Sequence, residues 1–107
     1  MNIPDVIKQL ITAQNKLDAA AYAHCFSADA TVLDEGKTYH GVIEIEQWIS
    51  AANDKYKTQM VPLDFVHLDG KDVLTTEISG TFDGSPVILS YNFVIEQGLI
   101  QTLKVTG

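Results

Sequence analysis

The residues with the clearest capacity for chemistry lie in the stretch FSADATVLDEGKTYHGVIEIEQWI, from Phe26 to Ile49. Two adjacent acids, Asp34 and Glu35, come directly before Gly36, and aromatic residues follow within a few positions. A carboxylate among aromatic side chains can act as a general base when apolar surroundings raise its pKa. An aspartate beside a glycine can equally be an ordinary turn residue whose carboxylate accepts backbone N–H groups. The sequence leaves both interpretations of Asp34 open.

Strand alternation separates the two acids. Ala30, Val32 and Asp34 share one side of a predicted strand, and Glu35 lies on the other side if the strand persists. We therefore expect the Asp34 carboxylate to face the interior and Glu35 to face solvent. Burial disfavours the charged form of a carboxylate, so the pKa of Asp34 should be raised.

Large aromatic residues supply candidate walls for a pocket around Asp34. They would fill the core of any fold, and in a fold with a cavity they would also line that cavity. The sequence does not separate these two roles. The candidate substrate-binding residues are Tyr22, Tyr39, Trp48, Tyr56, Phe82 and Tyr91.

Histidine and cysteine give little support for other chemistry. His24, His40 and His67 are dispersed and show no H-x-H or H-x-x-x-H spacing, so we predict no metal site and no cofactor. Whether His24 or His40 takes part in the chemistry of Asp34 is left open by the sequence. Cys25 is the only cysteine, which excludes an intrachain disulfide, and its apolar neighbours are typical of a small core residue.

Composition limits the partners. The length of 107 residues predicts one domain, residues 1–107, and 46% hydrophobic residues are enough to build a core. The formal net charge of −7 disfavours nucleic acids and anionic membrane surfaces as partners. No apolar run approaches the roughly 20 residues of a membrane span. No secretory signal is visible either, so we expect a cytoplasmic protein.

The first half of the chain shows mainly helical periodicity. Apolar residues at helical spacing cover residues 5–14, and an Ala-rich segment over 17–26 predicts a second helix. A short strand is expected over 30–33, with residues 37–39 pairing back on it. A third helix is expected over 42–56.

The second half consists of four predicted strands. Turn signals separate them at Asp69-Gly70, at Asp83–Pro86 and at Gln97-Gly98. Three short turns predict an antiparallel meander, and helices followed by a sheet predict an α+β fold. We expect three N-terminal helices packed on one face of a curved antiparallel sheet. The open end of such a cone is a natural small-molecule pocket.

Three segments resemble the SnoaL-like branch of the nuclear transport factor 2 and ketosteroid isomerase superfamily. They are CFSADATVLDEGKTYHGVIEIEQWI, the pair Lys55-Tyr56, and GTFDGSPVILSYNFVIEQGLIQTLKV. The match covers almost the whole chain. It implies a cystatin-like, nuclear transport factor 2-like cone and a homodimer formed through the sheet face. The superfamily hosts isomerases, dehydratases, epoxide hydrolases, cyclases and non-enzymes, so its fold alone assigns no reaction.

The resemblance to ketosteroid isomerases places Asp34 at the position of their general base, at the end of the first strand. Their oxyanion hole also needs a Tyr on the first helix and a protonated Asp on the penultimate strand. Those positions fall on Leu10 and on Leu89 or Ser90. Neither leucine can donate a hydrogen bond, and losing one oxyanion donor typically costs about 10²–10³ in rate. We therefore expect no true steroid isomerisation.

Two functions follow from these residues. The first is a cofactor-independent isomerase, cyclase, dehydratase or hydrolase that uses Asp34 as general base on a small apolar organic molecule. The second is a non-catalytic ligand-binding or dimerisation module of the same fold. A second polar group beside Asp34 inside a cavity would favour the first, and a filled core around Asp34 would favour the second.

Overall fold

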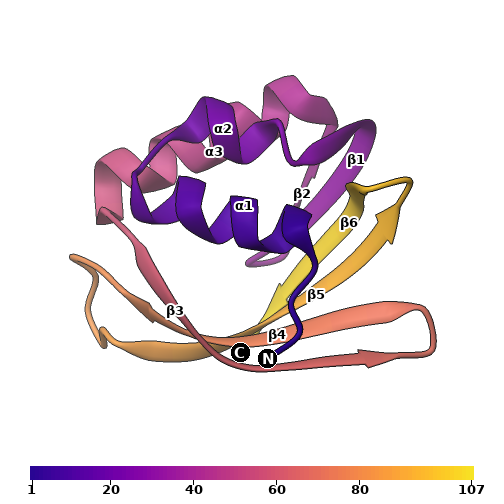
Figure 1. Ribbon diagram of the computed structural model, residues 1–107. Coiled ribbons are helices and arrows are strands. Elements are labelled where there is room, and N and C mark those ends of the chain that lie inside the picture. Colours follow the sequence, from indigo (N-terminus) through magenta and orange to yellow (C-terminus); the bar gives the residue numbers. More distant parts are fainter.

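The computed structural model describes residues 1–107, with three helices on one side of a six-stranded sheet (Figure 1). The helices are α1 (Asp5–Asn15), α2 (Ala19–Ala23) and α3 (Gly41–Tyr56). The strands are β1 (Phe26–Asp34), β2 (Lys37–His40), β3 (Gln59–Leu68), β4 (Lys71–Ser79), β5 (Val87–Glu96) and β6 (Leu99–Thr106). No helix has the length and apolar character needed to cross a membrane.

The sheet is mixed, which corrects the expected antiparallel sheet. Its strand order is β2-β1-β6-β5-β4-β3. The predicted meander from β3 to β6 is confirmed, and β1 and β2 form an antiparallel hairpin, but β1 pairs with β6 in parallel. Turn signals specify only strands that follow each other along the chain. The β1–β6 pair joins strands that are far apart in sequence, so no turn residue could report its direction.

The expected set of three N-terminal helices also needs correction. Only α1 and α3 are long, and α3 follows the first hairpin. The helix predicted over 17–26 is reduced to the five residues of α2, which begins where the Asp18 side chain accepts a hydrogen bond from the backbone N–H of Ala21. The chain is already extended at Phe26, where β1 pairs with β6. Strand pairing thus overrides the helix propensity of the alanines.

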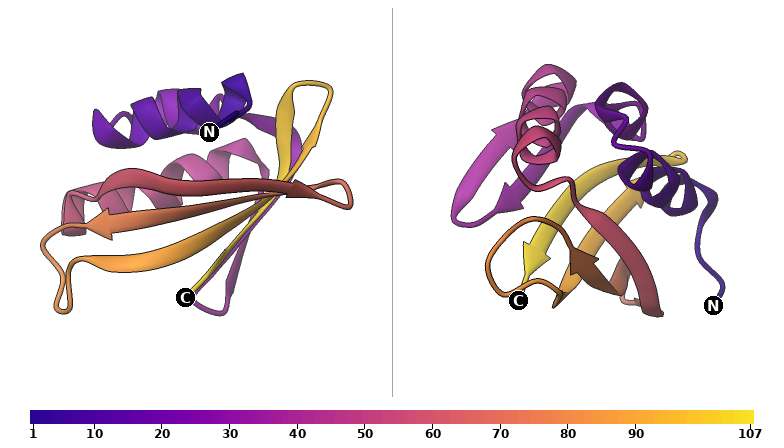
Figure 2. Two further views of the ribbon diagram at one scale, coloured as in Figure 1. Left: turned by 60° about the horizontal axis from the view of Figure 1, so that its bottom comes forward. Right: turned by 90° about the vertical axis from the view of Figure 1, so that its left-hand side faces the viewer.

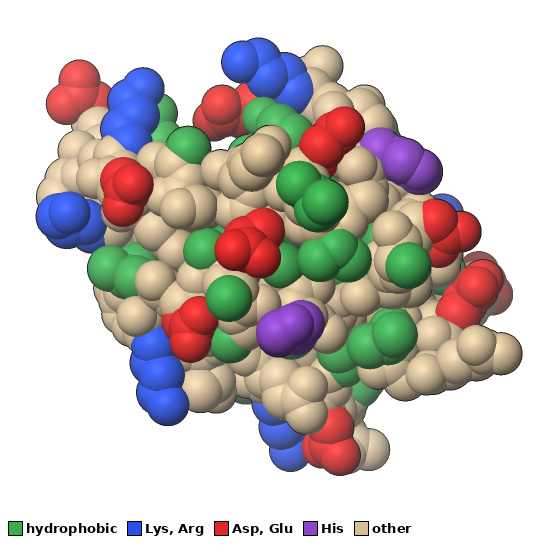
Figure 3. All heavy atoms as spheres, turned by 90° about the horizontal axis from the view of Figure 1, so that it is seen from above, with side chains coloured by type: hydrophobic (Ala, Val, Ile, Leu, Met, Phe, Trp, Pro, Cys, Tyr) green, Lys and Arg blue, Asp and Glu red, His purple; other side chains and the backbone are tan.

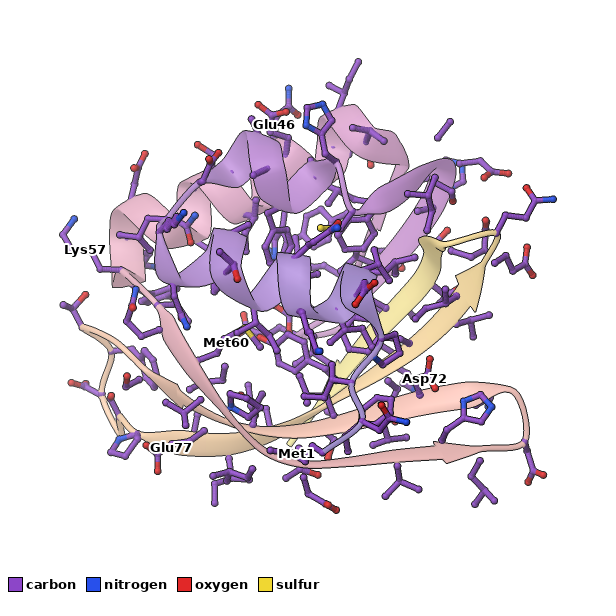
Figure 4. All side chains as sticks on the ribbon, viewed as in Figure 1. Met1, Glu46, Lys57, Met60, Asp72 and Glu77 are labelled. Atoms are coloured by element: carbon purple, nitrogen blue, oxygen red, sulfur yellow. The ribbon has the colours of Figure 1, made fainter.

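The sheet curls around the helices, so the core lies between α1, α2 and α3 and the concave face of the sheet (Figure 2). Met60 of β3 points into this space (Figure 4). Eighteen buried hydrophobic residues form one cluster. Those with no exposed surface include Ile7, Leu10, Ala30, Val32, Ile45, Leu74, Phe93, Ile100 and Leu103.

Two amides at the end of α1 attach this helix to the edge strand β3. The Asn15 side chain pairs with both backbone groups of Met60, accepting from its N–H at 2.8 Å and donating to its carbonyl at 3.0 Å. The buried Gln14 amide donates to the Thr58 carbonyl and to Asn53 Oδ1 on α3. Asn15 therefore occupies the place of a neighbouring strand at this end of the edge, which limits pairing with another chain there.

A second carboxylate, outside the predicted site, is buried on the concave face of the sheet. Asp72 on β4 is 6% exposed (Figure 4), and its carboxylate contacts Nδ1 of His67, its direct cross-strand neighbour on β3. The imidazole provides a polar partner that a buried carboxylate requires. His67 thus has a structural role that its sequence context, beside Asp69, did not indicate.

Candidate functional site

Asp34 is the last residue of β1 and does not form the turn. Its ladder partner is Lys37, and the two residues between them, Glu35 and Gly36, both have positive φ values of 52° and 75°. This is the geometry of a two-residue hairpin turn of type I′. The turn therefore depends on Glu35 and Gly36, and the Asp34 side chain is free for another role.

The predicted orientation of the two acids is confirmed. Ala30 and Val32 are fully buried, Asp34 is partly buried, and Leu33 and Glu35 are exposed. The strand alternation therefore continues to its last residue. The Asp34 carboxylate faces the interior at the end of the hairpin, where it keeps contact with solvent.

Aromatic rings from α2, α3 and β2 lie beside one another at this end of the fold. Tyr39 stacks on Trp48 with ring centroids 5.4 Å apart, and Tyr22 meets the edge of Trp48 at 6.1 Å. The Trp48 indole lies near the Asp34 carboxylate and opposes the rise that burial causes in its pKa. Trp48 therefore connects the carboxylate to both tyrosines.

The fourth aromatic residue, Tyr91, reaches the site across the sheet. Tyr91 pairs with Val105, and the pairing of Leu33 with Lys104 places Asp34 beside Val105 in the parallel β1–β6 register. Tyr91 and Asp34 thus share one row of the concave face. The pKa of the Tyr91 hydroxyl is raised, first by burial and then by the charge of Asp34.

Burial is also the main influence on Asp34 itself. It raises the pKa of the carboxyl above its ordinary value, and the neighbouring charge of Glu35 raises it further. The Trp48 indole acts in the opposite direction. The one contact between a basic and an acidic side chain within ion-pair distance joins His67 and Asp72, so no cationic side chain neutralises Asp34. The site therefore contains a desolvated carboxylate without a counterion.

Tyr22 is the most deeply buried of these aromatic residues, with 1% of its surface exposed. Burial raises the pKa of its hydroxyl well above the ordinary value, and the nearby Tyr91 and Asp34 raise it further. Both phenols therefore stay protonated and can donate hydrogen bonds. Sequence patterns identified these two residues as walls but gave no indication of hydroxyls beside the acid.

The remaining two predicted substrate-binding residues form a separate pair. Tyr56 and Phe82 meet edge-on at 5.9 Å, at the C-terminal end of α3. Gly80 permits this contact, because a Cβ atom there would lie 2.5 Å from the Tyr56 carbonyl oxygen. No aromatic contact links this pair to Trp48. The structure thus brings four of the six aromatic candidates together near Asp34.

The positions expected for oxyanion donors hold no donor. Leu10 is fully buried in the core, and Leu89 lies on the same face of β5 as Tyr91. Ser90 lies on the opposite, convex face, since its neighbours in sequence point inward. A hydroxyl at Ser90 therefore points away from the interior. The groups near Asp34 that can donate are instead the Trp48 indole and the hydroxyls of Tyr22 and Tyr91.

The other candidate residues lie apart from Asp34 or serve local structure. His24 is exposed at the end of α2, and His40 is exposed before α3, where its ring contacts Thr31 at 3.2 Å. Cys25 is buried, and burial raises the pKa of its thiol to about 11. No three His, Cys, Asp or Glu side chains converge as metal ligands.

Two hollows of the outer surface lie over helices and include none of the predicted site residues. One follows the exposed stripe of α3 from Ile43 to Asp54, and the other lies between α1 and α2 near Lys8 and Lys16. On the helical side of the molecule, acidic side chains alternate with small hydrophobic patches (Figure 3). The hollows are thus surface features of the helices, distinct from the aromatic surroundings of Asp34.

Comparison with solved structures identifies the fold. A protein from Sinorhizobium meliloti, provisionally assigned as a polyketide cyclase, is 34% identical, with a TM-score of 0.94 over 99% of this chain and 97% of its own. The chain belongs to the SnoaL-like, nuclear transport factor 2-like superfamily. No protein-family model and no curated protein matches the sequence.

Two more distant structures show the same fold. An NTF2-like protein of unknown function from Cytophaga hutchinsonii is 18% identical, with a TM-score of 0.79 over 99% of this chain and 93% of its own. A protein with a ketosteroid isomerase-like fold from Catenulispora acidiphila, solved with trimethylamine, is 17% identical. Its TM-score is 0.86 over 99% of this chain and 87% of its own. The predicted superfamily and cystatin-like fold are thereby confirmed.

Removal of the Asp34 charge should stabilise this SnoaL-like protein at pH 7. Burial holds the pKa of folded Asp34 above its value in the unfolded chain, so the unfolded chain releases this proton first as pH rises. As pH rises from the ordinary aspartate pKa to the higher pKa of folded Asp34, the free energy of unfolding of the wild type therefore falls. Asp34→Asn has no ionisable group at this position and does not show this loss. In thermal melts from pH 3 to 8, the melting temperature of Asp34→Asn should rise increasingly above that of the wild type as pH increases.

Glu35→Gln is the matched control for these melts, because it removes the same charge one residue along at an exposed position. Its gain in stability should be smaller than that of Asp34→Asn. An asparagine variant that is less stable than the wild type at pH 7, or a difference that does not change with pH, would contradict the burial of this charge.

Proposed function

We propose that this protein binds a small, largely apolar organic molecule beside Asp34 and that Asp34 acts on it as a general base without a cofactor. The reaction class is isomerisation, cyclisation, dehydration or hydrolysis. The observation that carries the proposal is the desolvated Asp34 carboxylate, which has no counterion and lies among Tyr22, Tyr39, Trp48 and Tyr91. A base with a raised pKa is better matched to proton transfer near neutral pH.

The geometry supports a base rather than a purely structural acid. The turn beside Asp34 is formed by other residues, and Trp48 is the one neighbouring side chain that lowers the pKa of its carboxyl. A structural carboxylate would normally have more polar partners or a cation. The bound trimethylamine of the Catenulispora acidiphila protein and the assignment of the Sinorhizobium meliloti protein support a small organic ligand for this fold.

A non-catalytic ligand-binding or dimerisation module is the second candidate. The buried Leu10 and inward-facing Leu89 favour it, because ketone enolisation in the isomerase manner requires strong donors at those positions. Proton transfer from Asp34 distinguishes the two candidates. A catalytic protein should accelerate a base-dependent reaction on an apolar probe, and a module should bind the probe without changing its rate.

The Kemp elimination of 5-nitrobenzisoxazole measures this proton transfer. The base removes the C3 proton, the C–H electron pair forms the nitrile, and the N–O bond breaks to release a coloured phenolate. The wild type should catalyse the reaction, with kcat/KM rising with pH through the pKa of Asp34. Asp34→Asn should lower kcat/KM by about 10²-fold or more.

Glu35→Gln is the control, and it should retain most of the activity because its side chain is exposed. Equal rates for the wild type and Asp34→Asn would reject Asp34 as the base. A wild type that binds the probe but gives only the buffer rate would establish the non-catalytic candidate.

We also propose that the protein forms a homodimer through the convex face of the sheet. Val61, Glu77 and Ile88 form one row of cross-strand neighbours on β3, β4 and β5. Val61 and Ile88 are 55% and 59% exposed, on the side opposite the buried Met60. A second copy would cover these apolar side chains, and a standard interface buries about 1,600 Å² in total.

Ile88→Lys should convert the dimer to a monomer, since it places a charge in the proposed interface. Ile43→Lys is the matched control, because Ile43 is 75% exposed on α3, away from the sheet. Light scattering at high micromolar concentration should show a dimer for the wild type and for Ile43→Lys. A wild type that is monomeric under these conditions would refute the dimer.

A further inference from the structure

We propose that the ligand held beside Asp34 is a small organic ammonium ion, a protonated or quaternary amine with apolar substituents. The inference rests on the proposed binding site and names the chemical class of its ligand. Two independent observations carry it: a partly buried carboxylate that no side chain of the protein neutralises, and aromatic rings from separate elements placed around that carboxylate.

The charge of the site is the first argument. Asp34 faces the interior, and the only cationic residue paired with it in the ladder, Lys37, is exposed and forms no ion pair with it. Glu35, the next residue, adds a second negative charge nearby. The formal net charge of the protein is −7, so its field also favours cations. A cationic ligand would supply the missing counterion.

The surroundings of the carboxylate are the second argument. Tyr39 and Trp48 are stacked on each other, and both residues are only partly buried. Tyr22 contacts the edge of Trp48, and Tyr91 shares the sheet row of Asp34. Aromatic rings attract cations through the negative charge of their faces, and quaternary ammonium groups are recognised by such rings. A strongly hydrated metal ion or a bare lysine-like ammonium fits these apolar walls less well.

The phenols complete the complementarity. Neither hydroxyl, of Tyr22 or of Tyr91, hydrogen-bonds another protein group. Tyr91 is 8% exposed and Tyr22 only 1%, so Tyr91 is the more accessible of the two phenols. The Tyr91 hydroxyl can therefore accept a hydrogen bond from, or donate one to, a polar substituent of the ligand, such as a hydroxyl two carbons from the nitrogen, whereas Tyr22 is too deeply buried for this contact.

Choline and 3,3-dimethyl-1-butanol provide a matched pair of probes. The two molecules have the same shape and the same hydroxyl group. The central atom is a positively charged nitrogen in choline and an uncharged carbon in the alcohol. Trp48 is the only tryptophan, so its single indole N–H resonance reports directly on this site. Titration of the full chain should shift that resonance saturably, with a Kd for choline at least about tenfold below that for the alcohol.

Three variants assign the preference to individual residues. Asp34→Asn should abolish the preference for choline and leave the affinity for the alcohol unchanged. Glu35→Gln removes the same charge at an exposed position and should retain the preference. Tyr39→Leu keeps an apolar side chain but removes a ring face, and it should weaken choline binding several-fold with little effect on the alcohol.

Equal or tighter binding of the alcohol by the wild type would overturn the inference, as would equal losses in Asp34→Asn and Glu35→Gln. Absence of an indole shift with either probe at millimolar concentration would also overturn it. The proposed function is tested separately by the Kemp elimination. If the elimination depends on Asp34 but choline binds no more tightly than the alcohol, Asp34 is a general base that acts on neutral substrates, and only the ammonium inference fails.

Discussion

The site depends on the parallel pairing of β1 with β6. This is the only strand pairing that joins the β1–β2 hairpin to the meander of β3 to β6. It therefore fixes the position of Asp34 along the sheet. A shift of one residue would turn Asp34 outward and Glu35 inward, because the side-chain period of a strand is two. A shift of two would move the acid out of the row of Tyr91. The register of one strand pair therefore decides whether the acid meets the aromatic rings.

The surroundings of Asp34 are unfavourable for its charged form, in contrast to those of the other buried polar groups. The buried carboxylate of Asp72 has the imidazole of His67, the Gln14 amide donates to Asn53 and Thr58, and the Asn15 amide pairs with both backbone groups of Met60. Asp34 has no counterion, and Trp48 is the one neighbouring side chain that lowers its pKa. Apart from Asn53 Nδ2, the buried structural polar groups thus have partners, whereas Asp34 lacks a counterion, which is the pattern expected of a binding or catalytic group.

Local sequence patterns predicted what depends on neighbouring residues. Dipeptides with glycine at 35–36, 69–70 and 97–98 adopt the positive φ values of hairpin turns, so the meander and the first hairpin were predictable. The alternation of Ala30, Val32 and Asp34 correctly predicted that the acid faces inward. These features arise from turn geometry and strand period, which act over a few residues.

Features that depend on distant contacts were not predictable in this way. The parallel β1–β6 pair and the shortness of α2 result from pairing between residues about 70 positions apart. Tyr56 and Phe82 are large aromatic residues like Tyr39 and Trp48, and no sequence pattern separates the two pairs. In the structure Tyr56 and Phe82 meet at the C-terminal end of α3, away from Trp48. The inward-facing amide of Asn53 and the carboxylate of Asp72 occupy core positions that sequence patterns assign to hydrophobic residues, because their partners lie on other elements.

The ionisation of Asp34 is the property on which the account depends, and a carbon-13 NMR titration of its carboxyl group measures that property directly. The account predicts a pKa above the ordinary aspartate value, a smaller elevation in Glu35→Gln, and a larger one in Trp48→Phe, which lacks the indole N–H. An Asp34 pKa at or below the ordinary value in the wild type would contradict it.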